Sequence, residues 1–202
     1  MATAAAPTTI FRRATPDDAR ALATSAFLDG RRIDMQELAA NLGIGRATLY
    51  RWVSSREELI SQVLEFLAQD FIAVARAGIT GRGNAAILDF VRSIVDAVSA
   101  FEPASVFIRQ EPLLGLRLLV GEEGRVYRRV CAGLRELVLE QRPDVAVEAV
   151  DRLVPIVVQE AGMMIWTSLA IGERPRVERI CTVAEALLEM VVPPKRRPPA
   201  AR

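Results

Sequence analysis

Residues 33–60, IDMQELAANLGIGRATLYRWVSSREELI, decide the fold of this chain. Asp34 is a helix-capping residue with Glu37 three positions on, and this capping-box arrangement predicts the start of a helix. An apolar pattern at i, i+3, i+4 and i+7 follows and stops at Gly43. After this glycine turn a second short helical stretch, RATLYRWV, begins at residue 46. The segment therefore predicts a helix, a tight turn and a second helix.

The second helix of this pair has more aromatic and basic side chains than a small core needs. Leu49 and Val53 share one side of it, which leaves Tyr50 and Trp52 beside the arginines on its other sides. Residues 39–55 contain no acidic side chain, so the segment is a local positive site. A protein that reads the major groove of DNA needs these groups on a helix that follows a tight turn. The spacing also fits a helix pair in which the aromatic residues only pack and the arginines are solvated, because such pairs occur in helical proteins of every function.

Helix signals continue along the chain, and no stretch shows the period-two alternation of a half-buried strand, so the predicted fold class is all-α. Thr15 before Pro16, Ser55 with Glu58 in a capping box, and Asn84 after a glycine-rich stretch all predict helix starts. The expected helices cover residues 16–29, 34–42, 46–53, 55–78, 84–100, 124–142, 144–170 and 176–191, with short helices between residues 103 and 124.

Composition argues against most enzymatic chemistry. The chain has no histidine and only two cysteines, Cys131 and Cys181. It therefore lacks an imidazole base, a nucleophile paired with histidine, and the ligands of a histidine or thiolate metal site. We expect no enzyme activity, no cofactor and no metal. With 26 basic and 25 acidic side chains, any site for a polyanion has to be local.

Two further segments bear on location. The first residues lack a basic start followed by a long apolar run, so we expect a cytoplasmic protein. Residues 153–171 approach the length that spans a bilayer, but Pro155, Gln159 and Glu160 each raise the cost of insertion. We therefore expect a buried helix there and no membrane partner.

Residues 15–64 resemble the DNA-binding segment of the TetR family of bacterial transcription regulators. The resemblance rests on the L-A-x-x-L-G-I turn, on T-L-Y in the second helix of the pair, and on S-R-E-E-L at the next helix start. Gly45 differs from the capping serine that is frequent in the family. The rest of the chain is similar in architecture only. The resemblance implies a DNA-binding domain at residues 1–64, a ligand-binding and dimerisation domain at 65–192, and a basic proline-rich tail at 193–202.

The resemblance also implies which side chains contact an operator. Base edges would be read from the start of the second helix, with help from the helix before it, while the aromatic residues and a later arginine hold phosphates. Arg12 and Arg13 would serve as an arm in the minor groove or along the backbone, or else belong to an unstructured start. The implied DNA-binding residues are Gln36, Arg46, Ala47, Thr48, Tyr50, Arg51, Trp52 and Arg56.

A homodimer and an effector pocket are implied as well. Two late helices, at 144–170 and 176–191, would form a four-helix interface, because one subunit reads too few base pairs alone. The pocket would lie within residues 84–170 and take an apolar or amphipathic molecule. Residues 161–180 are similar to regulators of lactone-degrading, quorum-quenching operons, which implies a lactone. The candidate pocket residues are Phe90, Phe107, Arg109, Leu114, Tyr127, Gln159, Glu160, Met163, Trp166 and Thr167.

Taken together, these patterns predict a repressor that an effector releases from double-stranded operator DNA, with the long helix at 55–78 as the connecting lever. The first alternative is a helical small-molecule sensor that has no DNA target. The second is an enzyme, for which the composition leaves little chemistry.

Overall fold

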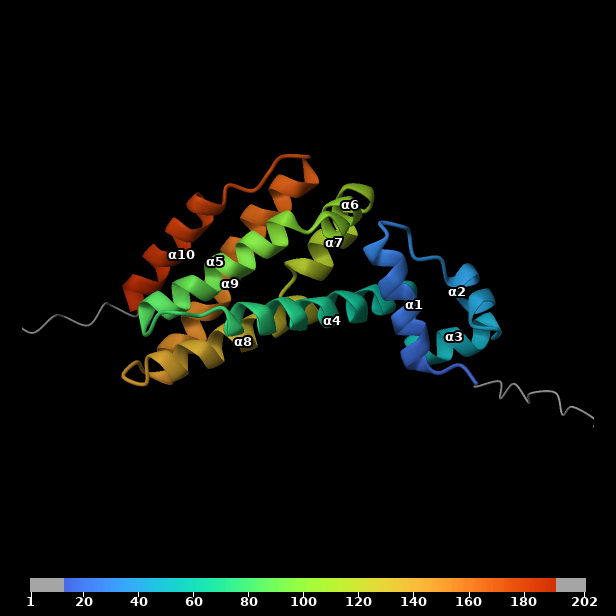
Figure 1. Ribbon diagram of the computed structural model, residues 1–202, viewed down its shortest axis with the longest axis horizontal. Helices are drawn as coiled ribbons and strands as arrows, with labels where there is room; N and C mark the ends of the chain where they lie inside the picture. Colours follow the sequence, from blue (N-terminus) through green and yellow to red (C-terminus); the bar gives the residue numbers. More distant parts are fainter. Residues whose placement is uncertain (1–12, 192–202) are drawn as a thin grey trace, which may run out of the picture.

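The structure, a computed structural model, describes residues 13–191 (Figure 1). The described residues form ten α-helices and no strand, which confirms the all-α class. The helices are α1 (Pro16–Leu28), α2 (Met35–Asn41), α3 (Arg46–Val53), α4 (Arg56–Ala77), α5 (Asn84–Ala100), α6 (Glu102–Gln110), α7 (Pro112–Leu119), α8 (Arg125–Gln141), α9 (Val147–Ala170) and α10 (Val177–Val191). Arg12 and the expected tail at 193–202 lie outside the described residues.

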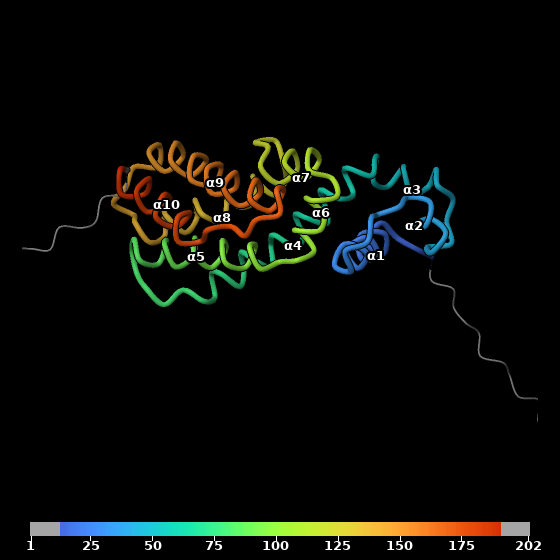
Figure 2. The backbone as a smooth tube through the Cα atoms, turned by 90° about the horizontal axis from the view of Figure 1, so that it is seen from above, coloured from blue at the N-terminus to red at the C-terminus, as the bar shows by residue number. Residues whose placement is uncertain are grey.

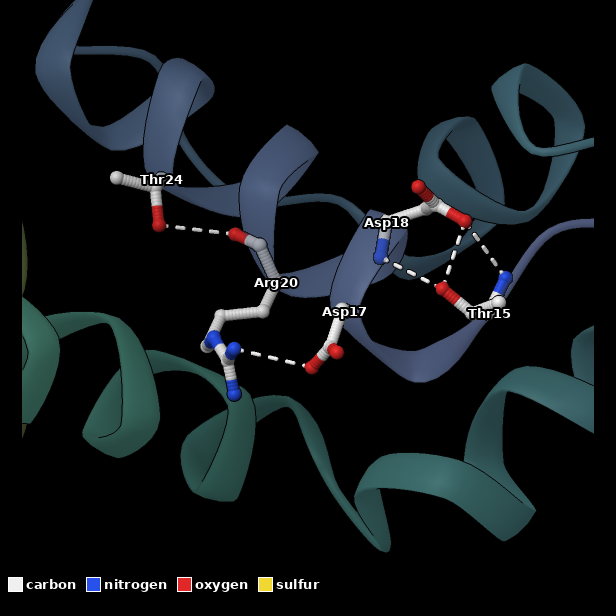
Figure 3. Close-up of polar contacts among 5 residues, drawn as sticks. All are labelled: Thr15, Asp17, Asp18, Arg20 and Thr24. Carbon is white, nitrogen blue, oxygen red and sulfur yellow. Dashed lines mark hydrogen bonds and ion pairs between the residues drawn. The ribbon is translucent and has the colours of Figure 1, made fainter.

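The start of α1 follows its local sequence closely (Figure 3). The Thr15 side chain accepts a hydrogen bond from the Asp18 amide, and the Asp18 carboxylate accepts one from the Thr15 amide at 2.8 Å. This reciprocal pair satisfies two of the amides that a helix start leaves without partners. Pro16 has no amide hydrogen to lose at this position, so the expected helix start is confirmed.

The other predicted caps are only partly confirmed. Asp34 accepts from the amides of Gln36 and Glu37 at 2.7 and 3.0 Å. Ser55 likewise accepts from the Glu58 amide at 3.0 Å, but the Glu58 carboxylate turns to Gln62 and Arg125 and does not complete a box. The cap expected at Asn84 is wrong: the residue before α5 is Gly83, and no side chain caps that helix.

The chain divides into a small head and a longer bundle, with α4 extending from one to the other (Figures 1 and 2). The head consists of α1, α2 and α3, which pack on one another, and α1 and α3 also contact α4. The rest of α4 packs with α5 and α8 in the bundle, so this helix continues through the domain boundary expected at residue 64. Buried apolar residues of head and bundle belong to one contiguous core.

Helix α9 starts at Val147 and continues through Pro155 to Ala170. By length and composition it is the one described helix that could cross a membrane. In the structure it packs against α8 and α10, and 33% of its most apolar stretch is buried, so the buried helix expected there is only partly buried. α6 and α7 form a short corner between this bundle and the head, where α6 contacts α1 (Figure 1).

Candidate DNA-binding surface and effector cavity

Helix α3 presents most of its side chains to solvent. Only Leu49 and Val53 are buried, and they attach the helix to the head core. Most of its other side chains face outward because one apolar stripe is enough to hold so short a helix. We call the outward groups together with Gln36 of α2 the α3 surface; its members are Gln36, Arg46, Ala47, Tyr50 and Arg51, which are exposed, and Thr48, which is half-buried.

The tight turn before α3 depends on glycine. Gly43 has a φ of +64°, a left-handed conformation that a side chain makes costly. Its amide donates to the Ala40 carbonyl, and the Ile44 amide donates to the Ala39 carbonyl, which closes the end of α2. Gly45 then precedes α3 with extended backbone and no side-chain cap. The departure from the family serine therefore removes a capping bond and leaves the helix in place.

Trp52 has a mixed position. It is half-buried and packs against the head core. Packing against the core is therefore one role of Trp52. The contact with phosphate that the family resemblance implies stays a prediction. Arg13, the described half of the predicted arm, is exposed ahead of α1.

Arg56 has a different role from the one expected. Its Nε donates to the Ile33 carbonyl at 2.7 Å, and its two terminal nitrogens donate to the Glu111 carboxylate at 2.8 and 2.5 Å. A guanidinium held by a bidentate carboxylate has little left to offer a phosphate. We therefore correct the assignment: Arg56 joins the loop before α2 to the corner between α6 and α7. Glu111 lies 55 residues along the chain from Arg56, and no local pattern connects them.

The same contact lowers the pKa of the Glu111 carboxyl below its ordinary value of 4.5, mainly through the hydrogen bonds from Arg56. Arg32 adds a weaker attraction, with its Nε 3.6 Å from a carboxylate oxygen of Glu111. In return, the Glu111 carboxylate raises the pKa of Arg56. Both partners are about one-fifth exposed at their side chains, so the pair is shielded from solvent more than the other ion pairs of the head.

We expect acid to remove the stabilising effect of Glu111. A carboxyl whose pKa is lower in the folded state contributes stability fully above its unfolded pKa, and the contribution is lost as the pH falls through the folded pKa. Wild type should therefore be more stable than Glu111→Gln at pH 7, and the difference should shrink below pH 4.5. Urea unfolding of both proteins across pH 3–7 measures this. Glu102→Gln, in an exposed pair with Arg109, is the control and should change little at any pH.

The bundle contains an apolar cavity of about 110 Å³ that is partly open to solvent. Its wall comes from the middle of α4, residues 90–98 of α5, the start of α6, the end of α7, the first half of α8 and the second half of α9. Three of the predicted pocket residues line it: Phe90 of α5, Tyr127 of α8 and Trp166 of α9. The Tyr127 hydroxyl donates to the Pro155 carbonyl at 3.3 Å, and burial raises the pKa of this phenol to about 12.

The other predicted pocket residues do not line this cavity. Phe107 packs on Phe27 of the head, with ring centroids 5.6 Å apart, and Arg109 forms an exposed pair with Glu102. Several predicted pocket residues on α9 also lie outside the wall. This helix is apolar on most sides, so its sequence does not show which side faces inward. Those misplaced residues are Gln159, Glu160, Met163 and Thr167 of α9; Leu114 of α7 also lies outside the wall.

The sequence analysis did not predict that α4 contributes to the cavity wall. Leu64, Leu67, Ala68, Phe71 and Ile72 form one face of this helix and line the cavity. The signal was present in the i, i+3, i+4, i+7, i+8 spacing of these residues, which continues far beyond the part of α4 that the head covers. The cavity therefore touches the same helix that begins directly after α3.

Part of the surface of α9 and α10 is apolar and exposed. Ile156 and Met163 of α9 are 50% and 40% exposed, and Met190 of α10 is 80% exposed. Exposed apolar side chains on two adjacent helices favour burial against another chain.

Comparison with known proteins agrees with this architecture. Residues 82–189 match the family described as "Tetracyclin repressor-like, C-terminal domain". Two solved structures are similar in fold. The TetR-family transcriptional repressor QsdR of R. erythropolis has a TM-score of 0.78 and 24% identity, covering 91% of this chain and 97% of that one.

The second structure is AlkX, a TetR-family repressor of Dietzia sp. strain DQ12-45-1b that is implicated in biodegradation of n-alkanes. Its TM-score is 0.62 and its identity 19%, covering 90% of this chain and 99% of that one. The search of curated proteins found no match. Because the family match covers more than half of the 202 residues, the chain belongs to the TetR family of tetracycline-repressor-like proteins.

Proposed function

We propose that this protein is a cytoplasmic, homodimeric transcription repressor that leaves its operator when a small apolar molecule enters the bundle cavity. The observation that carries the proposal is the α3 surface: basic, aromatic and small side chains stand outward on a helix after a tight glycine turn. A helix of this kind fits the major groove of DNA. The assigned base-reading residues are Arg46, Ala47 and Thr48, helped by Gln36, while Tyr50, Arg51 and Trp52 hold phosphates.

Dimerisation is part of this proposal. A single α3 reads only a few base pairs, so a specific repressor needs two copies at matching spacing on a two-fold symmetric site. The exposed apolar residues of α9 and α10 provide the surface for pairing. A symmetric interface uses the same patch on both subunits, and the two late helices of each chain would then form a four-helix contact.

Effector and DNA are coupled in the proposal through two contacts between bundle and head. The first is α4, which lines the cavity and also packs against α1. The second is α6, because Phe101 at its start lines the cavity and its ring centroid lies 6.4 Å from that of Phe27 in α1. The Arg56–Glu111 pair holds the far end of α6 to the head. An effector that favours a wider cavity would shift these helices and the spacing of the two heads.

Selection of binding sites from a pool of random duplexes tests this function. We expect the protein to enrich a two-fold symmetric sequence, with half-site centres about 34 Å apart or a multiple of that distance. Affinity for the selected duplex should fall by roughly 10³-fold or more between about 50 mM and about 200 mM salt, because several phosphate contacts release counterions. Failure to enrich any sequence, together with retained binding of small molecules, would favour the sensor without a DNA target.

A further inference from the structure

The wall of the bundle cavity holds no charged side chain among the described residues. Its polar groups are few, and the two large ones are the Tyr127 phenol and the Trp166 indole. The phenol uses its proton on the Pro155 carbonyl. The titratable groups that act on it are Cys131, whose pKa burial raises, and Glu122, which is exposed. The cavity is therefore lined by neutral groups.

Trp166 differs from the phenol because its donor is unused. The side chain is buried, with 7% of the residue exposed, and it lines the cavity. Its indole N–H forms no hydrogen bond to any residue in the described range 13–191. Indole nitrogen can only donate. In the described residues the fully buried side-chain polar atoms without a partner are Ser99 Oγ and Gln159 Oε1, so the Trp166 nitrogen is still accessible to an acceptor of a ligand.

We propose that the effector is an uncharged, mostly aliphatic molecule with one hydrogen-bond acceptor, such as a carbonyl oxygen, which accepts from the indole N–H of Trp166. The inference deepens the proposed function and rests on it only in treating the cavity as the effector site. Ions are excluded because an unpaired charge moved into this wall would lose its hydration without compensation.

The size of the cavity limits the effector further. An apolar cavity of about 150 Å³ is large enough for benzene, and this one measures about 110 Å³. A chain of six or more carbons is larger than this volume, so we expect it to bind with part of the wall moved outward. Such a ligand binds more tightly to a protein state with a wider cavity than to the state with the cavity described above. An effector needs this difference in affinity between two states in order to change the spacing of the heads.

A set of six-carbon ligands tests the proposal on the full protein without DNA. Hexane, 2-hexanone, hexanoate and hexylammonium share a chain length and differ in the acceptor and the charge. By titration calorimetry we expect 2-hexanone to bind more tightly than hexane. Hexylammonium should not bind measurably. Hexanoate should bind only as its neutral acid, so its affinity should rise about tenfold for each pH unit lowered between pH 8 and 6.

Trp166→Phe separates the hydrogen bond from the apolar contact. This variant keeps an aromatic ring and removes the donor, so 2-hexanone should lose roughly 2- to 12-fold in affinity while hexane, which also reports that the variant is folded, binds as before. Trp52→Phe, the matching change in the head, should alter neither. Equal losses for hexane and 2-hexanone in Trp166→Phe, or hexanoate binding that is tight and independent of pH, would overturn the proposal. Loss of operator selection with this ligand pattern intact would instead contradict the proposed function alone.

Discussion

Arg46→Ala should weaken binding to the selected operator by about 2 to 6 kcal/mol per dimer, because a bidentate contact between arginine and guanine contributes about 1 to 3 kcal/mol and each dimer loses two. Arg46 is exposed at the first turn of α3. It donates no hydrogen bond to another residue in the described part of the chain, so the substitution costs the fold little. Fluorescence anisotropy with a labelled duplex measures the change.

Arg109→Ala is the matched control for this experiment. It removes the same charge from α6, in the corner between bundle and head, where Arg109 pairs with the exposed Glu102. The control should bind the operator almost as well as wild type. If both variants lost affinity equally, the effect would come from overall charge, and the assignment of Arg46 to a base edge would be wrong. A base contact also requires the loss to be largest on the selected sequence and small on random DNA.

Leu49→Ala should destabilise the head by about 2 to 5 kcal/mol, the range for deleting most of a buried leucine side chain. Leu49 is fully buried and, with Val53 and the half-buried Trp52, packs α3 against the core. The loss is a large fraction of the stability available to a small domain. We expect operator binding to disappear, while binding of 2-hexanone in the bundle cavity remains. Hydrogen exchange, read separately for residues 16–53 and 84–170, measures the two regions.

Tyr50→Ala, one position along the same helix, is the control for Leu49→Ala. Tyr50 is 38% exposed, so its removal should change stability by no more than about 0.5 kcal/mol. It should nevertheless weaken operator binding, because the phenol is assigned to a phosphate. Operator affinity that is unchanged in Tyr50→Ala would contradict the proposed orientation of α3. Retained head protection in Leu49→Ala would show that the helix is fastened by contacts other than its apolar stripe.

The head could be predicted almost entirely from its sequence. The Thr15 cap, the Gly43 turn and the Leu49 and Val53 stripe are local signals, each acting within one or two helical turns. Because α3 is short and has one apolar face, its outward residues follow from spacing alone. Of the residues that the family resemblance assigns to DNA, the structure exposes Gln36, Arg46, Ala47, Tyr50 and Arg51. Their contact with DNA stays a prediction.

The bundle cavity could be predicted only in outline. The apolar character of residues 84–170 indicated a cavity, and three of the residues named for it, Phe90, Tyr127 and Trp166, line the cavity that the structure shows. The rest required knowledge of which face of each helix turns inward. Because α9 is apolar around most of its circumference, its apolar periodicity does not show which face turns inward. Met163 and Trp166 look equivalent in sequence, yet Met163 is exposed and Trp166 lines the cavity.

By itself, the sequence determined the helical class, the head and the outward groups of α3, because capping and amphipathic spacing act over a few residues. The tertiary structure alone decided that Glu111 holds the Arg56 guanidinium, that α4 forms part of the cavity wall, and that the Trp166 donor has no hydrogen-bond partner in the described residues. These contacts join residues that are far apart along the chain. They exist only once packing has set the distance and rotation between helices, which short-range patterns do not encode.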